Sequence, residues 1–289
     1  MTHAPAIRHA RLGFFFGLGL CVLLLAGCPP KVVKPKAPGG ADPAPVWSRF
    51  VQESRATSEA TRAKAFNLNA ALHYSSPKTA SRLAIHFWGN LDSPLRLDLQ
   101  TGMGQTLGYW REDKNGFTAY VPDKKTAFLH HDGRLGMAGF GIALPFTMRE
   151  LGLLLNGRWA GLFPETYVSA RALPGKGFSY AFTQQGETYT LELDPEAKPL
   201  AMSTAGAAPW RLTFSDFEPA DQANTATRLP KKIVMTRDPD EKVVIVIKKL
   251  EQIPELWPEE KLMLNLPPGT QTHIMDNTSA LDREEPHLG

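Results

Sequence analysis

Apolar and polar residues alternate along the first half of the chain with a period of two. In residues 95–99, for example, three leucines alternate with Arg96 and Asp98. Such alternation is typical of a strand with one face in the core and the other in solvent. Proline, glycine and the pair Asn115-Gly116 separate the alternating segments. The pattern predicts an antiparallel meander of six strands, at residues 66–74, 83–87, 95–99, 107–109, 117–121 and 127–131.

Two segments have helical spacing instead. Residues 46–64 carry a narrow apolar stripe that includes Trp47 and Phe50, so this helix is expected to lie on another element. Residues 145–157 form the second segment, which begins at a proline, a residue favoured in the first turn, and ends at a glycine. Its apolar residues recur at Met148, Leu151, Leu154 and Leu155.

A second series of alternating segments predicts further strands at residues 178–182, 189–193, 210–214 and 243–247. About a dozen strands with two helices exclude a doubly wound α/β fold, which needs a helix between successive parallel strands. We therefore expect a mainly β protein: an open, half antiparallel β-barrel of about 11–12 strands, with an N-terminal helix and a short helical plug. The alternative is a β-sandwich whose two sheets pack together and leave no ligand space.

The N-terminus has the layout of a secretory signal. Arg8 and Arg11 precede an uncharged run at residues 12–26, which is shorter than the roughly 20 residues of a membrane-spanning helix. Residues 25–28, Leu-Ala-Gly-Cys, resemble the lipobox of bacterial lipoproteins, and this resemblance implies cleavage before Cys28 and acylation of its sulfur. The alternative is an ordinary cleaved signal peptide with an incidental cysteine.

These features divide the chain into four parts. Residues 1–27 are interpreted as the lipoprotein signal peptide, and residues 28–45 as the lipidated cysteine with a proline-rich tether, because so many prolines cannot bury a core. Residues 46–275, about the size that one hydrophobic core can serve, are expected to form a single β-barrel domain. The polar and acidic residues 276–289 are interpreted as a mobile tail.

The net charge bears on the class of binding partner, and the cysteine content bears on disulfide formation. The chain has 32 Lys and Arg against 29 Asp and Glu. Removing residues 1–27 takes away two positive charges and leaves 30 minus 29, or +1, which argues against nucleic acid as a partner. Cys21 lies in the removed segment, so Cys28 is the one cysteine left and no disulfide can form within one mature molecule.

The order of several short motifs resembles the LolB family of outer-membrane lipoprotein insertion factors and, more loosely, the LolA/LolB-like superfamily of periplasmic lipoprotein carriers. The resemblance covers residues 47–158. The sequence departs from the family pattern in two ways: it has methionine at position 103, where the family has leucine, and its second half is longer than in typical members. The matching segments are the helix with Trp47, the strand at residues 66–74, the aromatic strand at residues 82–88, the turn at residues 101–104 and the Gly-x-x-x-Pro segment at residues 141–146.

This resemblance implies a carrier and receptor system. It implies a monomer anchored in the outer membrane and facing the periplasm, which receives acylated lipoproteins from a LolA-like periplasmic carrier and inserts them into outer-membrane lipid. Pro29, where an inner-membrane sorting signal would have aspartate, also points to the outer membrane under the sorting rules of enterobacteria.

The resemblance also supplies the candidate site residues. Gly102, Met103 and Gly104 would form a turn whose methionine contacts the bilayer, although a methionine at a strand end is as readily a core residue. Apolar residues of the strands and of the plug helix would line or cover an acyl-chain cavity. These residues are Leu72, Ile85, Phe87, Leu97, Leu99, Ile142, Leu144, Phe146, Leu151 and Leu154.

The sequence offers no catalytic constellation. We find no Gly-x-Ser-x-Gly elbow and no paired-carboxylate signature, so neither an enzyme nor a cofactor is expected. His130, His131 and Asp132 form a metal-like cluster, but consecutive histidines on a strand point to opposite faces, so no metal site is expected either. The second hypothesis for function is a scaffolding envelope lipoprotein without a ligand cavity.

Overall fold

The alternating segments are strands of one continuous sheet. The computed structural model of the protein describes residues 42–60, 63–140, 146–175, 177–184, 186–206, 209–219, 228–237 and 240–277, and fourteen strands join within these residues. The strands are β1 (Ala65–Ser75), β2 (Ala80–Asn90), β3 (Leu95–Thr101), β4 (Thr106–Asp113), β5 (Gly116–Val121), β6 (Thr126–His130), β7 (Ser169–Leu173), β8 (Gly177–Gln184), β9 (Glu187–Leu193), β10 (Pro199–Thr204), β11 (Trp210–Pro219), β12 (Arg228–Thr236), β13 (Lys242–Ile253) and β14 (Gln271–Ile274).

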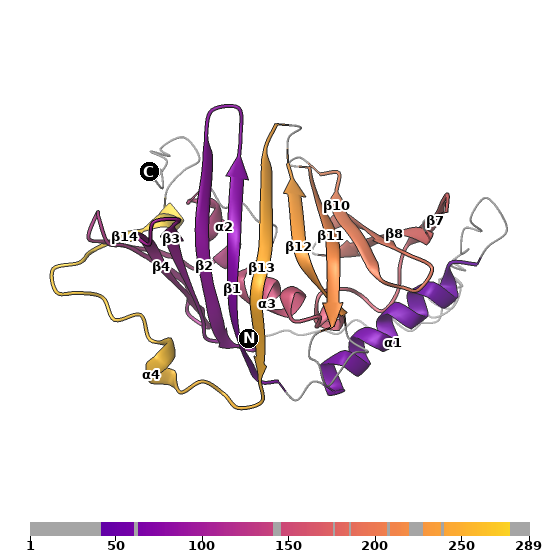
Figure 1. The fold of residues 1–289 in the computed structure, drawn as a ribbon, viewed down its shortest axis with the longest axis horizontal. Helices are drawn as coiled ribbons and strands as arrows, with labels where there is room; N and C mark the ends of the chain where they lie inside the picture. The colour runs from indigo at the N-terminus through magenta and orange to yellow at the C-terminus, as the bar shows by residue number, and fades with distance from the viewer. Residues whose placement is uncertain are drawn as a thin grey trace, which may run out of the picture. The chain divides into compact units, whose positions relative to one another are not determined.

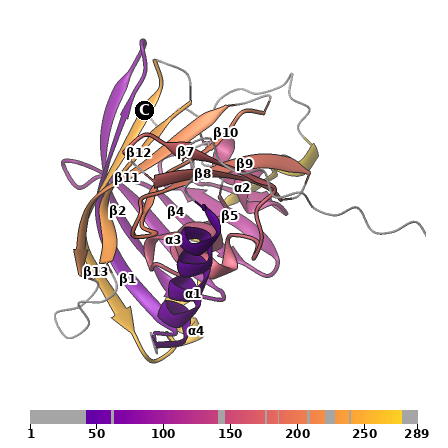
Figure 2. The ribbon, with the colours of Figure 1, turned by 90° about the vertical axis from the view of Figure 1, so that its right-hand side faces the viewer.

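The sheet consists of two meanders that share a seam. Its strand order is β14-β6-β5-β4-β3-β2-β1-β13-β12-β11-β10-β9-β8-β7, so β1–β6 and β7–β13 each run consecutively. At the seam, β1 pairs antiparallel with β13, and Leu72 lies opposite Ile245. Neighbouring strands are antiparallel except β14 and β6, which are parallel. The sheet curls around the connection between the two meanders (Figure 1, Figure 2).

Helices occupy the connections rather than alternating with the strands. The described residues include α1 (Ala44–Ala60), α2 (Gly133–Ala138), α3 (Met148–Leu155) and α4 (Glu259–Leu262), with 3-10 turns η2 (Trp159–Gly161) and η3 (Met275–Asn277). The short helix α3 lies on the concave face, inside the curl of the sheet (Figure 2). None of these helices has the length and apolar character that a membrane-crossing helix needs.

The N-terminal helix α1 packs on the second meander, although it precedes the first one in sequence. Trp47 is buried, its ring lies 4.9 Å from that of Tyr180 on β8, and its indole N–H donates to the carbonyl oxygen of Glu165 at 2.8 Å. Phe50 packs edge-on against Trp159 and Phe163. The aromatic stripe of α1 thus joins the core, as the predicted amphipathic helix requires.

Residues 254–270, which we call the C-terminal strap, link β13 to β14 across the convex face. The backbone N–H of Trp257 donates to the Asn90 side-chain oxygen at 2.8 Å, and its indole N–H donates to the Phe66 carbonyl at 3.2 Å. Arg111 donates from Nε to the Leu262 carbonyl at 3.0 Å, and Arg96 donates to the next carbonyl. Both arginines alternate with core residues along their strands, which places the strap opposite the core.

The predicted fold class is confirmed, with more strands than expected. The structure has a single mainly β, open and curled antiparallel sheet with an N-terminal helix and a plug helix, so the alternative of two packed sheets is wrong. The described residues contain fourteen strands rather than 11–12. The additional edge strand β14 is exposed at all four positions and therefore carries no alternation that a sequence pattern could reveal.

Candidate functional site

An apolar pocket lies between the plug helix and the concave face of the second meander. About 290 Å³ of space in and around it is free of protein atoms, part of it open to solvent, and only about one water molecule fits inside. Its lining contains apolar side chains alone, as an acyl-chain site requires. The lining residues are Phe146, Leu151 and Leu154 next to or on α3, Leu212 on β11, Ile233 and Met235 on β12, and Val243 and Ile245 on β13.

Local hydrogen bonds fix both ends of α3. Thr147 and Glu150 form a reciprocal capping box at its N-terminus. At its C-terminus the Asn156 side chain donates to the carbonyl oxygen of Gly152 at 2.8 Å, and Gln252 of β13 donates to the carbonyl oxygen of Asn156 at 3.3 Å. These contacts let a helix of only eight residues stay formed inside the sheet.

A half-buried carboxylate from the first meander also holds the start of α3. The two side-chain oxygens of Glu112 on β4 accept from the backbone N–H groups of Met148 at 2.9 Å and Arg149 at 3.2 Å. Burial raises the pKa of Glu112 and outweighs the lowering by these two hydrogen bonds, while the nearby Glu150 and Asp132 carboxylates raise it further. The contact therefore positions α3 at an electrostatic cost.

Close packing leaves little room on the other side of α3. A Cβ atom built on Gly152 would lie 3.3 Å from the Phe66 ring, so glycine allows the helix to approach β1. Phe66 is itself fully buried and packs edge-on against Phe87 at 4.9 Å. The concave face is therefore closed in this structure, and the pocket is smaller than the hydrocarbon-sized cavity that we expected.

The predicted cavity residues separate into two groups. Phe146, Leu151 and Leu154 line the pocket, whereas Ile142 and Leu144 lie outside the described residues. The strand residues of the first meander are buried but are not part of the pocket lining; these are Leu72, Ile85, Phe87, Leu97 and Leu99. The prediction missed the far wall, although the alternation at residues 210–214 and 243–247 had indicated that Leu212, Val243 and Ile245 face the core.

Met103 lies at the tip of the hairpin between β3 and β4. Its side chain is 95% exposed, and the alternative of a core methionine is therefore wrong. Gly104 has a φ of +88°, and its backbone N–H donates to the Thr101 carbonyl at 3.0 Å, which closes the turn. A Cβ built on Gly102 or Gly104 meets no atom within 4 Å, so the whole tip projects away from the described residues.

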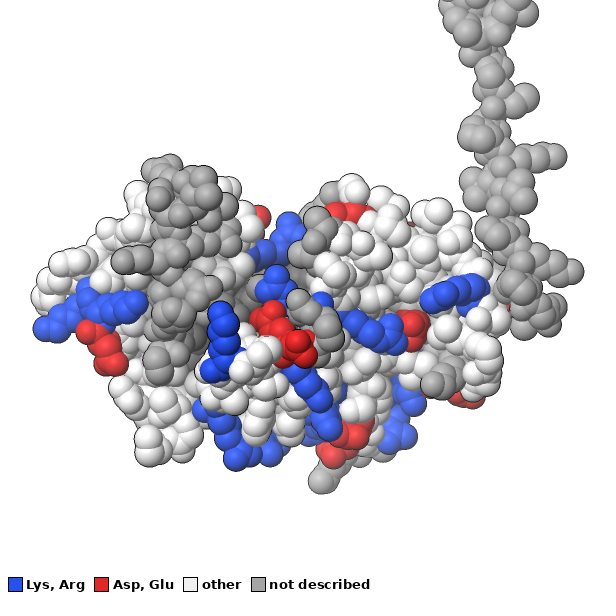
Figure 3. Space-filling view, turned by 90° about the horizontal axis from the view of Figure 1, so that it is seen from above, with Lys and Arg blue, Asp and Glu red and all other residues white. Residues whose placement is uncertain are grey.

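A second, open groove runs between the C-terminal strap and the β4–β5 turn, with about 930 Å³ of empty space. Its walls include Arg111, Lys114 and Glu259, so they are charged where the pocket under α3 is apolar. The face that Figure 3 presents also carries positive and negative side chains close together, with uncharged stretches between them. The groove does not match the chemistry of an acyl chain.

Comparisons with known proteins identify the fold. Neither family models nor curated protein sequences match the chain. A DUF1329 family protein from Desulfovibrio piger is 10% identical, covers 77% of this chain and 100% of its own, and superposes with a TM-score of 0.51. A LolA superfamily protein from Nitrosomonas europaea (9% identity, 74% and 97% coverage) has a TM-score of 0.48. A Vibrio parahaemolyticus domain described as a putative outer membrane lipoprotein-sorting protein domain is 12% identical, covers 73% of this chain and 94% of its own, and has a TM-score of 0.49.

The likeness to the Desulfovibrio protein, at 10% identity, concerns the fold alone. It shows that the two proteins share a fold over 77% of this chain. The chain therefore has the fold of that protein, and its activity has to be argued from the pocket and the exposed turn.

Proposed function

We propose that this protein is a lipid-anchored envelope protein that holds acyl chains between α3 and the concave face of its sheet. In this proposal it receives acylated lipoproteins from a LolA-like periplasmic carrier and inserts them into the outer membrane. The observation that carries the proposal is the wholly apolar pocket under α3. Each Å² of apolar surface removed from water stabilises the bound state by about 25 cal/mol, so transfer of a lipid tail needs no catalysis.

Acyl-chain binding requires α3 to move, because the pocket holds about one water molecule. The helix presents Leu151 and Leu154 to the pocket, and an acyl chain that replaced them would restore apolar contact with β11–β13. Because the acyl chain would lie between the displaced leucines and the sheet, the leucines would stay covered while the lipid tail leaves water. The cost of opening then comes mainly from the hydrogen bonds at the two ends of α3.

Met103 gives the proposed delivery step a contact with the bilayer. Burying a methionine side chain contributes about 1.5–3 kcal/mol, which is enough to favour a transient membrane encounter and too little to anchor the protein. Durable attachment would come from acyl chains on Cys28, since lipid anchoring needs more than one hydrocarbon chain. Cys28 lies outside the described residues, so the anchor and the outer-membrane location rest on the sequence.

The narrowness of the pocket favours a second candidate function, a scaffolding lipoprotein that binds no lipid. Such a protein would use its fixed surfaces to hold an envelope complex and would keep α3 in place. The two functions differ in one property: a carrier takes up a fatty acid, and a scaffold does not.

Uptake can be measured on the mature chain with Cys28→Ser, which cannot be lipidated. We expect a fluorescent fatty-acid probe to bind saturably with a blue shift, because its tail leaves water. Absence of saturable binding contradicts the carrier function and favours the scaffold.

Delivery is tested separately by Met103→Glu, which places a charge at the exposed tip. This variant should take up the probe normally and release it more slowly to liposomes. Leu256→Glu is a matched control because Leu256 is also exposed, at 59%, but lies on the C-terminal strap. Loss of both steps in Met103→Glu, or of neither, rejects the role of the turn.

A further inference from the structure

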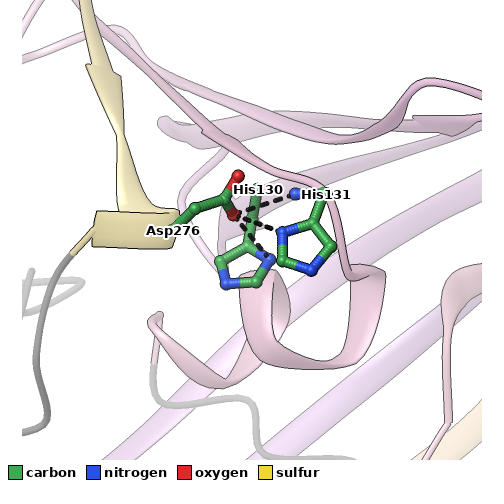
Figure 4. A group of neighbouring side chains, drawn as sticks. All are labelled: His130, His131 and Asp276. Atoms are coloured by element: carbon green, nitrogen blue, oxygen red, sulfur yellow. Dashed lines mark hydrogen bonds and ion pairs between the residues drawn. The ribbon is translucent and has the colours of Figure 1, made fainter. Parts of the chain in front are cut away.

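Two adjacent histidines and a distant aspartate converge at one edge of the sheet. Nδ1 of His130 lies 3.2 Å from Oδ1 of Asp276, and Nδ1 of His131 lies 2.9 Å from the same oxygen. One possible ligand atom from each residue lies within 4.8 Å of the others. Figure 4 shows both imidazole rings on the same side of the chain, facing the carboxylate.

The end of β6 explains why the two rings lie together. Consecutive side chains point to opposite faces only within a strand, and β6 ends at His130. The chain turns there, and the two rings stack with their centroids 4.9 Å apart and an interplanar angle of 21°. Our geometric reason for expecting no metal site is therefore wrong. Asp132, the third member of the expected cluster, turns away and caps α2 by accepting from Arg134 and Leu135.

The aspartate arrives through the parallel pairing of β14 with β6. Ile274 lies opposite Leu129, so two residues further on Asp276 comes beside His131. The backbone N–H of His131 donates to Asp276 Oδ1 at 3.0 Å and fixes this position. Sequence reasoning placed residue 276 in a tail and missed this ligand, because it is 145 residues away from His131.

The hydrogen bonds leave a mismatch in this group. Nδ1 of His130 accepts from the backbone N–H of Asp132 at 2.9 Å, so in a neutral ring this nitrogen carries no hydrogen. It therefore cannot donate to Asp276, and two acceptors face each other at 3.2 Å. A bound cation would remove the repulsion between the two acceptors.

We propose that His130 Nδ1, His131 Nδ1 and the Asp276 carboxylate bind a divalent transition-metal ion of the Zn²⁺ class. Imidazole and carboxylate are ligands that suit Zn²⁺, Ni²⁺ and Cu²⁺. Two ligand atoms on one tetrahedral Zn²⁺ lie about 3.3 Å apart, close to the 3.2 and 2.9 Å that separate the two Nδ1 atoms from Asp276 Oδ1. The ion takes the His130 lone pair from the Asp132 N–H, and water completes its coordination because His131 is exposed.

The ion would act as a clasp for the C-terminal segment. All four residues of β14 are exposed, so apolar burial contributes little to holding this strand on β6. A metal bond between Asp276 and the two histidines joins the strand to the sheet edge at its end. This site does not depend on the proposed acyl-chain pocket, since it shares no residue with the pocket lining.

The test is a Zn²⁺ titration of the full chain after treatment with a chelator. Calorimetry should find one saturable site, and hydrogen exchange at residues 271–277 should slow at least threefold when Zn²⁺ is bound. His131→Ala and Asp276→Asn should each weaken Zn²⁺ binding at least tenfold, and these exposed positions allow folding. His73→Ala is the matched control and should bind as the unchanged chain does.

Two results would overturn the proposal. One is the absence of any saturable Zn²⁺ site, which would leave a hydrogen-bonded cluster. The other is unchanged affinity in both His131→Ala and Asp276→Asn, which would place the ion on other histidines.

Discussion

The two faces of the sheet hold their covering segments by different interactions. On the concave face, α3 buries six of its eight residues, and its leucines meet an apolar pocket. On the convex face, the C-terminal strap buries one residue, Leu262. It accepts hydrogen bonds from Arg96 and Arg111, while its own Trp257 donates to the Phe66 carbonyl. Lipid can replace a leucine against the sheet, but it cannot replace a donor to a carbonyl oxygen. The difference indicates that α3 is the segment that gives way to an acyl chain, while the strap stays in place.

The largest expected effect separates the two faces at a single residue. Phe66→Ala removes a fully buried ring from the concave face and should lower the free energy of unfolding by about 3–5 kcal/mol. Trp257→Phe keeps an aromatic ring but removes the N–H that donates to the Phe66 carbonyl on the other side, and it should cost about 1 kcal/mol for the lost hydrogen bond. Urea unfolding measures both, and equal losses would contradict the comparison.

A smaller effect is expected when α3 is pushed away from β1. Gly152→Leu overpacks the contact with Phe66, which should lower the free energy of unfolding by about 1–3 kcal/mol. The higher helix propensity of leucine offsets up to about 1 kcal/mol of this loss. Because the helix is displaced, uptake of the fluorescent fatty acid should become faster. Adding Phe66→Leu makes room for the new side chain and should slow uptake again. Unchanged uptake in Gly152→Leu would indicate that α3 does not control entry.

A substitution on the convex face should loosen the C-terminal strap without changing lipid uptake. Arg111→Met removes the donor to Leu262 and should destabilise the strap locally by about 1–2 kcal/mol. Hydrogen exchange at residues 258–264 should accelerate, while fatty-acid uptake stays the same. Arg49→Met, an exposed change on α1, is the control. Altered uptake in Arg111→Met would contradict the division between the two faces.

The smallest effect concerns pH. Burial raises the pKa of Glu112 above its ordinary value of 4.5, so the folded protein binds this proton more tightly than the unfolded chain does. Its contribution to stability is fully present below about pH 4.5 and is lost as pH rises through the folded pKa. Glu112→Gln should flatten this part of the stability profile between pH 4 and 7. A profile identical to that of the unchanged chain would show that Glu112 does not cause it.

Alternation predicted most strands that place one face on the core, but the predicted ranges missed β10 and β12, which bury Met202, Ile233 and Met235. It failed for β14, whose residues are all exposed, because exposure on both faces removes the period-2 signal. The plug helix was predicted from its leucines, but its predicted start at Pro145 was wrong, because Thr147 caps the helix and Met148 is its first residue. The size of the pocket could not be predicted, because it depends on how closely Gly152 lets α3 approach Phe66.

Contacts between residues far apart in the sequence could not be predicted either. Glu112 meets the start of α3 across 36 residues, and Asp276 meets His131 across 145. Both contacts depend on strand order and register, which a local pattern does not specify. The sequence left the exposure of Met103 open, because the flanking glycines favour a turn tip whereas methionine is more often buried.

Photolabelling with a diazirine-bearing fatty acid tests the central claim most directly, because it reports where the hydrocarbon lies. On the mature chain with Cys28→Ser, we predict saturable labels in peptides that carry α3 and β11–β13, and competition by unlabelled palmitate. Labels confined to the groove beside the C-terminal strap, or labelling that does not saturate, would contradict an acyl-chain site under α3.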